Sequence, residues 1–152
     1  KWIKGLTTPG ESTELANPLI LKYRRRDEKR YHTVEISKGI FRIGRSNDNE
    51  LVLDNKTVEE QHGIIYQRYK GNQVFYELVN NGKVNPIVYE NREENKKEYL
   101  KVKEGVKLED HDEFYIGDIK FRIYIPGFID AVGTERVIMK EQETEEDVNE
   151  EE

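Results

Sequence analysis

The stretch Phe41-Arg42-Ile43-Gly44-Arg45-Ser46 ends an apolar run and opens a polar loop that extends to Glu50. A second apolar run, Leu51–Leu53, follows at once. Gly44 stands where the backbone must bend sharply, because glycine lacks the Cβ that restricts other residues. Arg45 then leaves the strand and enters the loop. We expect two strands joined by a loop that carries Arg45.

Short apolar or alternating runs separated by turn residues continue along the chain. None shows a sustained period of 3.6 residues with helix caps. Many short β-like runs in a limited length are typical of two packed sheets, so we predict an all-β sandwich of about ten or eleven strands. The runs are residues 19–23, 31–36, 40–43, 51–53, 63–69, 74–79, 87–89, 99–102, 113–116 and 119–125.

The clearest local signal is the segment Phe114–Tyr124. Gly117-Asp118 separates two β-rich runs by two residues, and glycine supplies the positive φ that a tight hairpin turn needs. Alternation after the turn places Ile119, Phe121, Ile123 and Ile125 on one face. This segment predicts an antiparallel hairpin.

Composition indicates one globular domain with polar extensions. The chain has 152 residues, of which 35% are hydrophobic and 37% charged, and this length is sufficient to bury a core. It has no Cys, which excludes disulfides and a Cys nucleophile and favours the cytoplasm, or the nucleus in a eukaryote. No apolar run approaches the roughly 18 residues of a membrane span, and the start of the chain lacks a signal-peptide core.

Charge and turn residues set the expected domain limits. Residues 1–17 are expected to be a flexible lead, and residues 18–127 the folded domain. Residues 128–152 are expected to be an acidic, disordered tail, because the formal charge of residues 140–152 is −7, which leaves +1 (−6 minus −7) for the rest of the chain.

Residues around Gly44 suit the capture of a phosphate group. A dianionic phosphate needs a bidentate cation and hydrogen-bond donors that converge from loops, and the Arg45 guanidinium matches its geometry better than a Lys would. Ser46 adds a hydroxyl in the same loop, although Ser is also a common turn residue. In the next polar segment, Lys56 offers a positive charge and Thr57 a second hydroxyl.

The order of these residues, followed by His62-Gly63, resembles the signature of the forkhead-associated (FHA) domain family over residues 18–126. The resemblance implies a β-sandwich with ligand loops at one end that recognises phosphothreonine in partner proteins. It assigns the phosphate contact to Arg45 after the motif residue Gly44. It also implies that His62 holds two loops together without touching the ligand.

One departure from the family signature lies just before His62. The family usually has a phosphate-binding Ser three residues before the His, and this chain has Glu59, followed by Glu60. A like charge about 4 Å away costs roughly 4 kcal/mol near a protein surface, close to a thousandfold in affinity. Glu59 could turn into solvent, or pair with Arg45 as a built-in phosphate mimic, or belong to a domain that recognises partners without phosphate. We favour the second and third together.

The family's other ligand-reading element is an Asn-Gly-Thr stretch, and two registers compete for it. Asn81-Gly82 keeps the first two residues but is followed by Lys83, whereas Asn85-Pro86 keeps only the Asn. Asn81 and Asn85 are therefore both candidate ligand residues, and Asn81-Gly82 could equally be a plain turn.

Three other features of the sequence allow a functional interpretation. The basic segment Lys22–Tyr31 could meet nucleic acid or an anionic lipid surface, but a solvated hairpin tip is the preferred interpretation. His32 and His111 stand alone in polar contexts, so neither a catalytic triad nor a metal site is expected. Self-association could follow phosphorylation of a flanking Thr such as Thr144, which has an acid three residues on.

The sequence therefore predicts a non-catalytic protein–protein interaction module of FHA type, with weakened or absent phosphothreonine recognition. The alternative is a working reader of phosphothreonine peptides. No cofactor or metal is expected, nucleic acid is an unlikely partner, and the expected partner is another protein, which could carry a phosphorylated Thr.

Overall fold

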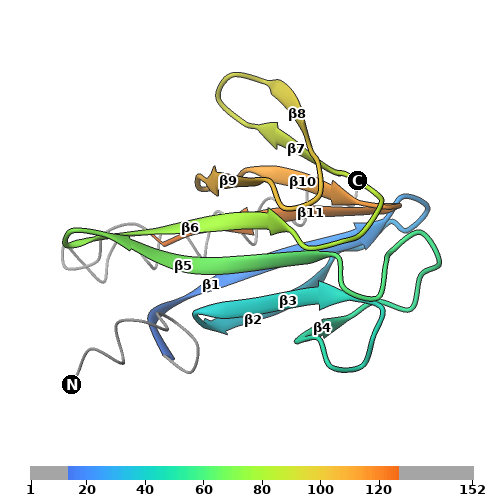
Figure 1. The fold of residues 1–152 in the computed structure, drawn as a ribbon, viewed down its shortest axis with the longest axis horizontal. Helices are drawn as coiled ribbons and strands as arrows, with labels where there is room; N and C mark the ends of the chain where they lie inside the picture. Colours follow the sequence, from blue (N-terminus) through green and yellow to red (C-terminus); the bar gives the residue numbers. More distant parts are fainter. Residues whose placement is uncertain (1–13, 127–152) are drawn as a thin grey trace.

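The computed structural model describes residues 14–126, which form eleven strands in two sheets (Figure 1). One sheet has the strand order β2-β1-β11-β10-β7-β8 and the other β4-β3-β5-β6-β9. The predicted all-β sandwich is confirmed. The strands are β1 (Glu14–Arg25), β2 (His32–Lys38), β3 (Ile40–Gly44), β4 (Leu51–Val52), β5 (Gly63–Lys70), β6 (Gln73–Asn80), β7 (Ile87–Asn91), β8 (Lys96–Leu100), β9 (Gly105–Leu108), β10 (Glu113–Ile116) and β11 (Ile119–Tyr124).

Each of the ten expected runs overlaps a strand. The eleventh strand, β9, was not predicted because its four residues include Gly105 and Lys107 and form an edge of the smaller sheet. β1 begins at Glu14, so it includes four residues that the sequence assigned to the flexible lead. The expected acidic tail, residues 128–152, lies outside the described residues, as do residues 1–13.

The β10–β11 hairpin forms as predicted. Phe114 pairs with Phe121 and Ile116 with Ile119, and Gly117 has a φ of +59°. The two phenyl rings stack at 4.7 Å between centroids inside the core. Ile119 and Ile123 are also buried, and Ile125 packs at the core margin.

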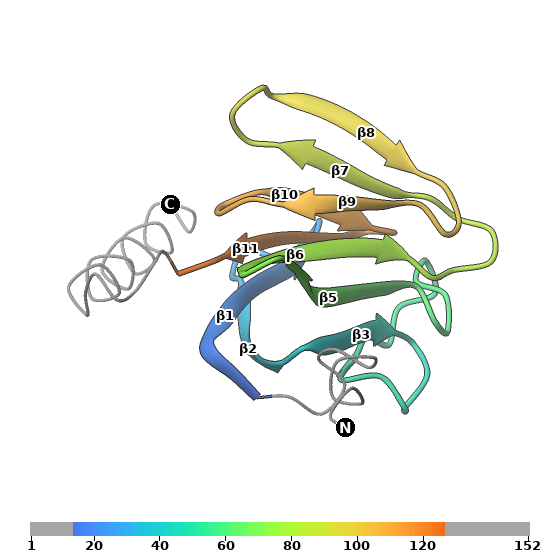
Figure 2. The same cartoon turned by 60° about the vertical axis from the view of Figure 1, so that its left-hand side comes forward.

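The loops that follow β1, β3, β4, β6, β8 and β10 meet at one end of the sandwich, because these strands all run toward that end. Most of these loops lie on the right in Figure 1. The backbone N–H of Arg26 donates to the Asp118 carbonyl at 3.2 Å, and the backbone N–H of Asn81 donates to the His62 carbonyl at 2.8 Å. At the side of the sandwich, β7 and β8 extend as a projecting hairpin (Figure 2). No helix in residues 14–126 is long and apolar enough to cross a membrane.

Candidate functional site

Gly44 brings two of the end loops into direct contact. An added Cβ at Gly44 would overlap the carbonyl oxygen of Glu60 and lie 2.8 Å from Nδ2 of Asn49. Glycine allows this approach because it has no Cβ. The next backbone N–H groups, those of Arg45 and Ser46, donate to the carbonyls of Glu59 and Glu60 at 2.9 and 3.2 Å. The β3–β4 loop (residues 45–50) is thereby fixed against the β4–β5 loop (residues 53–62).

Arg45 projects into solvent from this fixed backbone. Its Nε donates to the Val58 carbonyl at 3.0 Å, which holds the base of the guanidinium. The terminal nitrogens have no partner within residues 14–126. They carry four N–H donors in a fork that suits a phosphate or a carboxylate. Arg45 is therefore an anchored and accessible hydrogen-bond donor for an anion.

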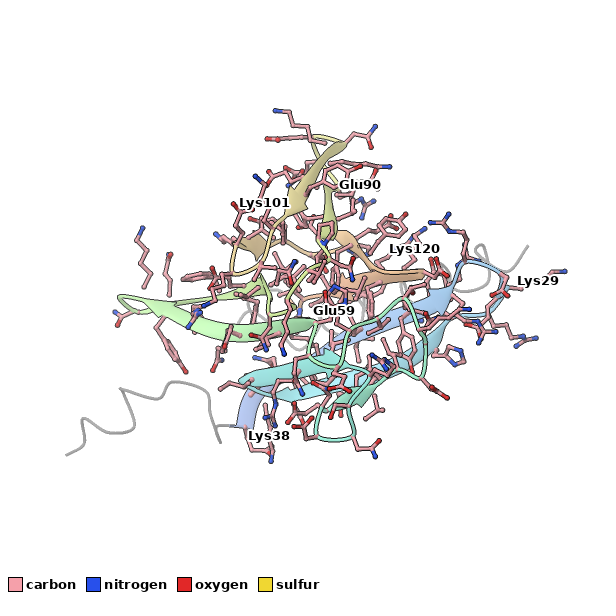
Figure 3. The ribbon with its side chains drawn as sticks, turned by 45° about the vertical axis from the view of Figure 1, so that its right-hand side comes forward. Lys29, Lys38, Glu59, Glu90, Lys101 and Lys120 are labelled. Atoms are coloured by element: carbon pink, nitrogen blue, oxygen red, sulfur yellow. The ribbon has the colours of Figure 1, made fainter. Side chains whose placement is uncertain are left out.

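Glu59 binds the backbone of the β6–β7 loop (residues 81–86). Its carboxylate accepts hydrogen bonds from the N–H groups of Lys83, Val84 and Asn85 at 2.6, 3.1 and 2.7 Å. Figure 3 shows Glu59 at the end of the sandwich where these loops meet. Burial works to raise the pKa of Glu59, but the three amide hydrogen bonds and nearby His62 lower it below the ordinary value.

The sequence suggested an ion pair between Glu59 and Arg45. Within residues 14–126 the two side chains have other partners, and this ion pair is not formed. Both carboxylate oxygens of Glu59 are instead taken up by three successive N–H groups of the β6–β7 loop, and hydrogen bonds of this kind favour the charged form of a carboxylate. Glu59 nevertheless is a built-in anion at the loop end.

His62 lies fully buried between the loops. Its Nδ1 accepts a hydrogen bond from the backbone N–H of Glu59 at 3.0 Å. Burial lowers the pKa of His62, opposed by the Glu59 charge and by the carbonyls of Asn85 and Pro86. The neutral ring can accept at Nδ1, so the imidazole supports the backbone that carries Glu59.

Asn80 organises the β6–β7 loop and was not singled out from the sequence. Its fully buried side chain donates to the carbonyls of Asn85 and Leu100 at 2.9 and 2.8 Å and accepts from the N–H of Gly82 at 2.8 Å. A polar residue directly after the apolar positions of β6 was the available signal. Asn81 and Asn85, the two candidates from the sequence, are both exposed in this loop.

Thr57 joins two loops through its hydroxyl. The hydroxyl donates to Oδ1 of Asn55 at 2.5 Å and accepts from the N–H of Asp118 at 2.9 Å. Its contacts hold the β10–β11 turn against the β4–β5 loop, so this hydroxyl is largely occupied. Lys56, its neighbour, is exposed.

Ser46 is half-buried beside Asp48. The hydrogen bonds from Gln61 and then from Ser46 lower the pKa of Asp48 below its ordinary value. Asn49, also in this loop, is buried and donates from Nδ2 to the carbonyls of Ser46 and Glu60, both at 2.9 Å. Hydrogen bonds of the Asn49 and Asp48 side chains therefore hold the β3–β4 loop that carries Arg45.

The FHA domain family model matches residues 41–117, just over half of the chain. The chain belongs to the FHA domain family. Members of this family are protein-interaction modules. The match includes the residues from Phe41 through Gly117 that build the loop end. No match was found among curated proteins.

Solved FHA domains have the same fold at low sequence identity. A structure described as an analysis of phosphothreonine-dependent FHA domain interactions aligns with a TM-score of 0.54 and 19% identity, covering 74% of this chain and 100% of the other. The FHA domain of CT664 from Chlamydia trachomatis aligns with a TM-score of 0.54 and 16% identity, covering 72% and 98%. The MEK1 FHA domain in complex with a phosphothreonine peptide of HOP1 gives 0.51 and 13%, covering 69% and 95%.

Proposed function

We propose that this FHA domain binds a segment of a partner protein at the β3–β4, β4–β5 and β6–β7 loops, with weakened phosphothreonine recognition. The observation that carries the proposal is the position of Glu59. Its carboxylate occupies three backbone N–H donors of the β6–β7 loop. A phosphate entering beside Arg45 would therefore meet a charge of its own sign where the family usually has a hydroxyl.

The three amide hydrogen bonds reduce the repulsion but do not remove it. They spread the carboxylate charge over the loop backbone, so the penalty is smaller than the roughly 4 kcal/mol of two bare charges about 4 Å apart. We expect Glu59 to weaken phosphothreonine binding about tenfold, which corresponds to about 1.4 kcal/mol. The partner's backbone and side chains would then supply most of the affinity.

The second candidate function is a working phosphothreonine reader. It is favoured by Arg45, because the terminal nitrogens of its guanidinium remain accessible while Nε anchors the group. Ser46, Lys56, Asn81 and Asn85 would supply further contacts from the same loops. The solved FHA domains described with phosphothreonine-dependent interactions support this alternative by family analogy.

A peptide-library experiment separates the two candidates. Wild-type protein is screened against a degenerate phosphothreonine library and its unphosphorylated counterpart, and selected peptides are titrated by calorimetry. Arg45→Ala tests the loop site, and Arg92→Ala, a change of the same kind in the β7–β8 turn at the far end of the sandwich, is the control.

We expect selected peptides to lose less than about tenfold in affinity without phosphate, and to depend on Arg45 but not on Arg92. Binding that vanishes without phosphate would establish the second candidate instead. Failure of every peptide to bind, or equal effects of both substitutions, would contradict a peptide site at these loops.

The partner is proposed to be another protein, and the module is proposed to be non-catalytic. We place it in the cytoplasm, or in the nucleus of a eukaryote, because the chain has no Cys. Self-association through a phosphorylated Thr144, or through Thr7, Thr8 or Thr13, remains a proposal because these residues lie outside the described range.

A further inference from the structure

A cleft of about 430 Å³ opens on the outer face of the six-stranded sheet, next to the end loops. We call it the basic cleft. It is lined by four cationic side chains, by two tyrosines and by the β10–β11 turn. The cations and tyrosines are Arg24, Arg26, Lys97, Lys120, Tyr99 and Tyr115.

Strand register places the lining of the basic cleft in one row. Arg24 of β1 pairs with Lys120 of β11, and Lys120 pairs with Tyr115 of β10. Tyr115 pairs with Val88 of β7, which pairs with Tyr99 of β8. Paired residues point to the same face, and the neighbours of Lys120 along β11, Ile119 and Phe121, are buried in the core. The row therefore faces outward across five adjacent strands.

Positive charge in the basic cleft exceeds negative charge. Asp118 is the one acidic residue of the lining, against four cations. Lys120 is partly compensated by Glu113, 3.6 Å away, and Arg24 donates to the carbonyl of Glu28 at 2.9 Å. Arg26 and Lys97 are exposed and form no ion pair within residues 14–126. The cleft thus presents two exposed cations without an ion-pair partner among the described residues, although Glu90 stands opposite Lys97 in the β7–β8 pair.

The aromatic side chains suit an extended polypeptide. Tyr99 lies on the projecting β7–β8 hairpin with 64% of its surface exposed, and Tyr115 lies on the floor of the cleft. Tyrosine offers a large apolar surface with a polar tip and is enriched at binding interfaces. Basic groups next to such surface fit a segment that alternates acidic and apolar residues.

The basic cleft is continuous with the proposed peptide site. Only the β10–β11 turn separates them, because the N–H of Asp118 binds the Thr57 hydroxyl on one side and its carbonyl accepts from Arg26 on the other. Lys120 lies two residues after Asp118 in the cleft lining and Glu59 lies two residues after Thr57, so the two residues flank this contact; both are labelled in Figure 3. An extended partner segment can therefore reach both.

We propose that the basic cleft is a second binding site that takes an acidic stretch of the partner protein, a few residues away from the segment bound at the end loops. The ligand chemistry is a cluster of carboxylates or phosphates on an extended chain. The inference rests on the proposed function for its partner, but the cleft can bind an acidic peptide by itself. Its role is to add affinity and selectivity where the loop site has lost part of its phosphate recognition.

Two double variants test the proposal in the 152-residue chain. Arg26→Glu with Lys97→Glu reverses two cleft charges, and Lys38→Glu with Lys70→Glu makes the same change in net charge. Lys38 and Lys70 are exposed and end β2 and β5 at the opposite end of the sandwich. The probes are a Glu-rich peptide containing Tyr, the same peptide with phosphoserine in place of Glu, and an uncharged Gly/Ser peptide. Affinities are measured by fluorescence polarisation at 0.15 M salt.

We expect the cleft variant to weaken acidic-peptide binding at least about tenfold, and the control variant less than about threefold, because distant charges are screened at this salt concentration. Amide NMR signals of Lys97–Tyr99 and Lys120 should shift with the Glu-rich peptide. A larger effect with phosphoserine identifies phosphate as the preferred group. Similar losses in both variants, or binding of the Gly/Ser peptide with equal affinity, would overturn the proposal.

Arg45→Ala makes the two proposals separable. In Arg45→Ala the amide signals of Lys97–Tyr99 and Lys120 should still shift with the Glu-rich peptide, whatever affinity the loop site loses, so a defective loop site cannot mimic a defective cleft. Tighter binding of a single-stranded oligothymidine than of the acidic peptides would reassign the cleft to nucleic acid and overturn the proposal. Shifts of the cleft signals when Glu141–Glu152 are neutralised to Gln, without any peptide, would show that the chain's own acidic segment occupies it and would equally overturn it.

Discussion

At the scale of single residues, Glu59 combines two properties at the loop end, a negative charge and a structural role. A Ser there would offer one hydroxyl to a ligand, whereas Glu59 uses its charge inside the protein to hold the β6–β7 loop. The same carboxylate therefore supports the shape of the site and opposes an anion in it. Substitution of Glu59 by a neutral residue should therefore favour anion binding and weaken the support of the β6–β7 loop.

Glu59→Ser is expected to strengthen binding of phosphothreonine peptides about tenfold, because it removes a negative charge and releases three N–H donors. Calorimetry with matched phosphorylated and unphosphorylated peptides measures the change. Combining it with Glu60→Arg should strengthen binding further. Glu60→Gln alone removes an exposed charge near the site and should have a smaller effect. An unchanged affinity for Glu59→Ser would show that Glu59 does not limit phosphate binding.

Asn80→Ala is expected to reduce the free energy of unfolding by about 3 kcal/mol, because it removes three hydrogen bonds and leaves the buried Leu100 carbonyl and Gly82 N–H unsatisfied. Its neighbour provides a control, since Asn81→Ala changes an exposed side chain and should cost less than about 0.5 kcal/mol. Urea denaturation followed by tryptophan or tyrosine fluorescence measures both. Equal stabilities would mean that the Asn80 contacts do not hold the loop.

At the scale of elements, the β10–β11 hairpin serves the loop end as well as the core. Its strands bring Phe114 and Phe121 into the interior, and its turn touches Thr57 of a loop far away in the sequence. Gly117 is needed twice, once for its φ of +59° and once because a Cβ would overlap Thr57. Gly71 has a similar φ but no close neighbour, so a comparison of the two glycines separates backbone strain from the overlap with Thr57.

Gly71→Ala and Gly117→Ala should lower the free energy of unfolding by different amounts. Gly71 has a φ of +63° but nothing within 4 Å of an added Cβ, so its substitution should cost about 1 kcal/mol from backbone strain. Gly117→Ala adds the overlap with Thr57, and we expect a total of about 3 kcal/mol together with weaker peptide binding. Thermal unfolding and calorimetry measure the two effects. Equal losses of stability in the two variants would indicate that the β4–β5 loop shifts away from the new Cβ at position 117 without a penalty.

At the scale of the whole molecule, the sandwich stabilises a buried neutral His62 at the junction of its loops. Burial lowers the pKa of His62 in the folded state. The unfolded chain, with a pKa near 6.5, therefore binds a proton before the folded chain does as the pH falls. The associated stability is fully present above pH 6.5 and is lost as the pH falls toward the lower folded pKa.

Wild-type protein should accordingly be less stable at pH 5.5 than at pH 7.5, since protonation favours the unfolded chain. Urea unfolding at both pH values measures the difference. His62→Gln should be less stable than wild type at pH 7.5, but its free energy of unfolding should change less between the two values. If the free energy of unfolding of His62→Gln changed as much between the two pH values as that of wild type, the pH dependence would arise from other groups.

The amino-acid sequence by itself determined the all-β sandwich, the hairpin at Gly117-Asp118 and the loop that carries Arg45. These features follow from local causes, namely apolar residues at every second position and glycines where the backbone bends or takes a positive φ. Strand β9 escaped prediction because it is a four-residue edge strand with only two apolar residues, and its pairing with β6 defines it.

Only the tertiary structure decided which groups the loop residues contact. Glu59 lies 24 residues before Lys83 and Thr57 lies 61 residues before Asp118, so no local pattern reveals that each pair is joined. The Asn80 contacts and the row of residues in the basic cleft likewise depend on strand register. Those partners are set by how distant strands pair and pack, because contacts at such separations arise only when the two sheets close around one core.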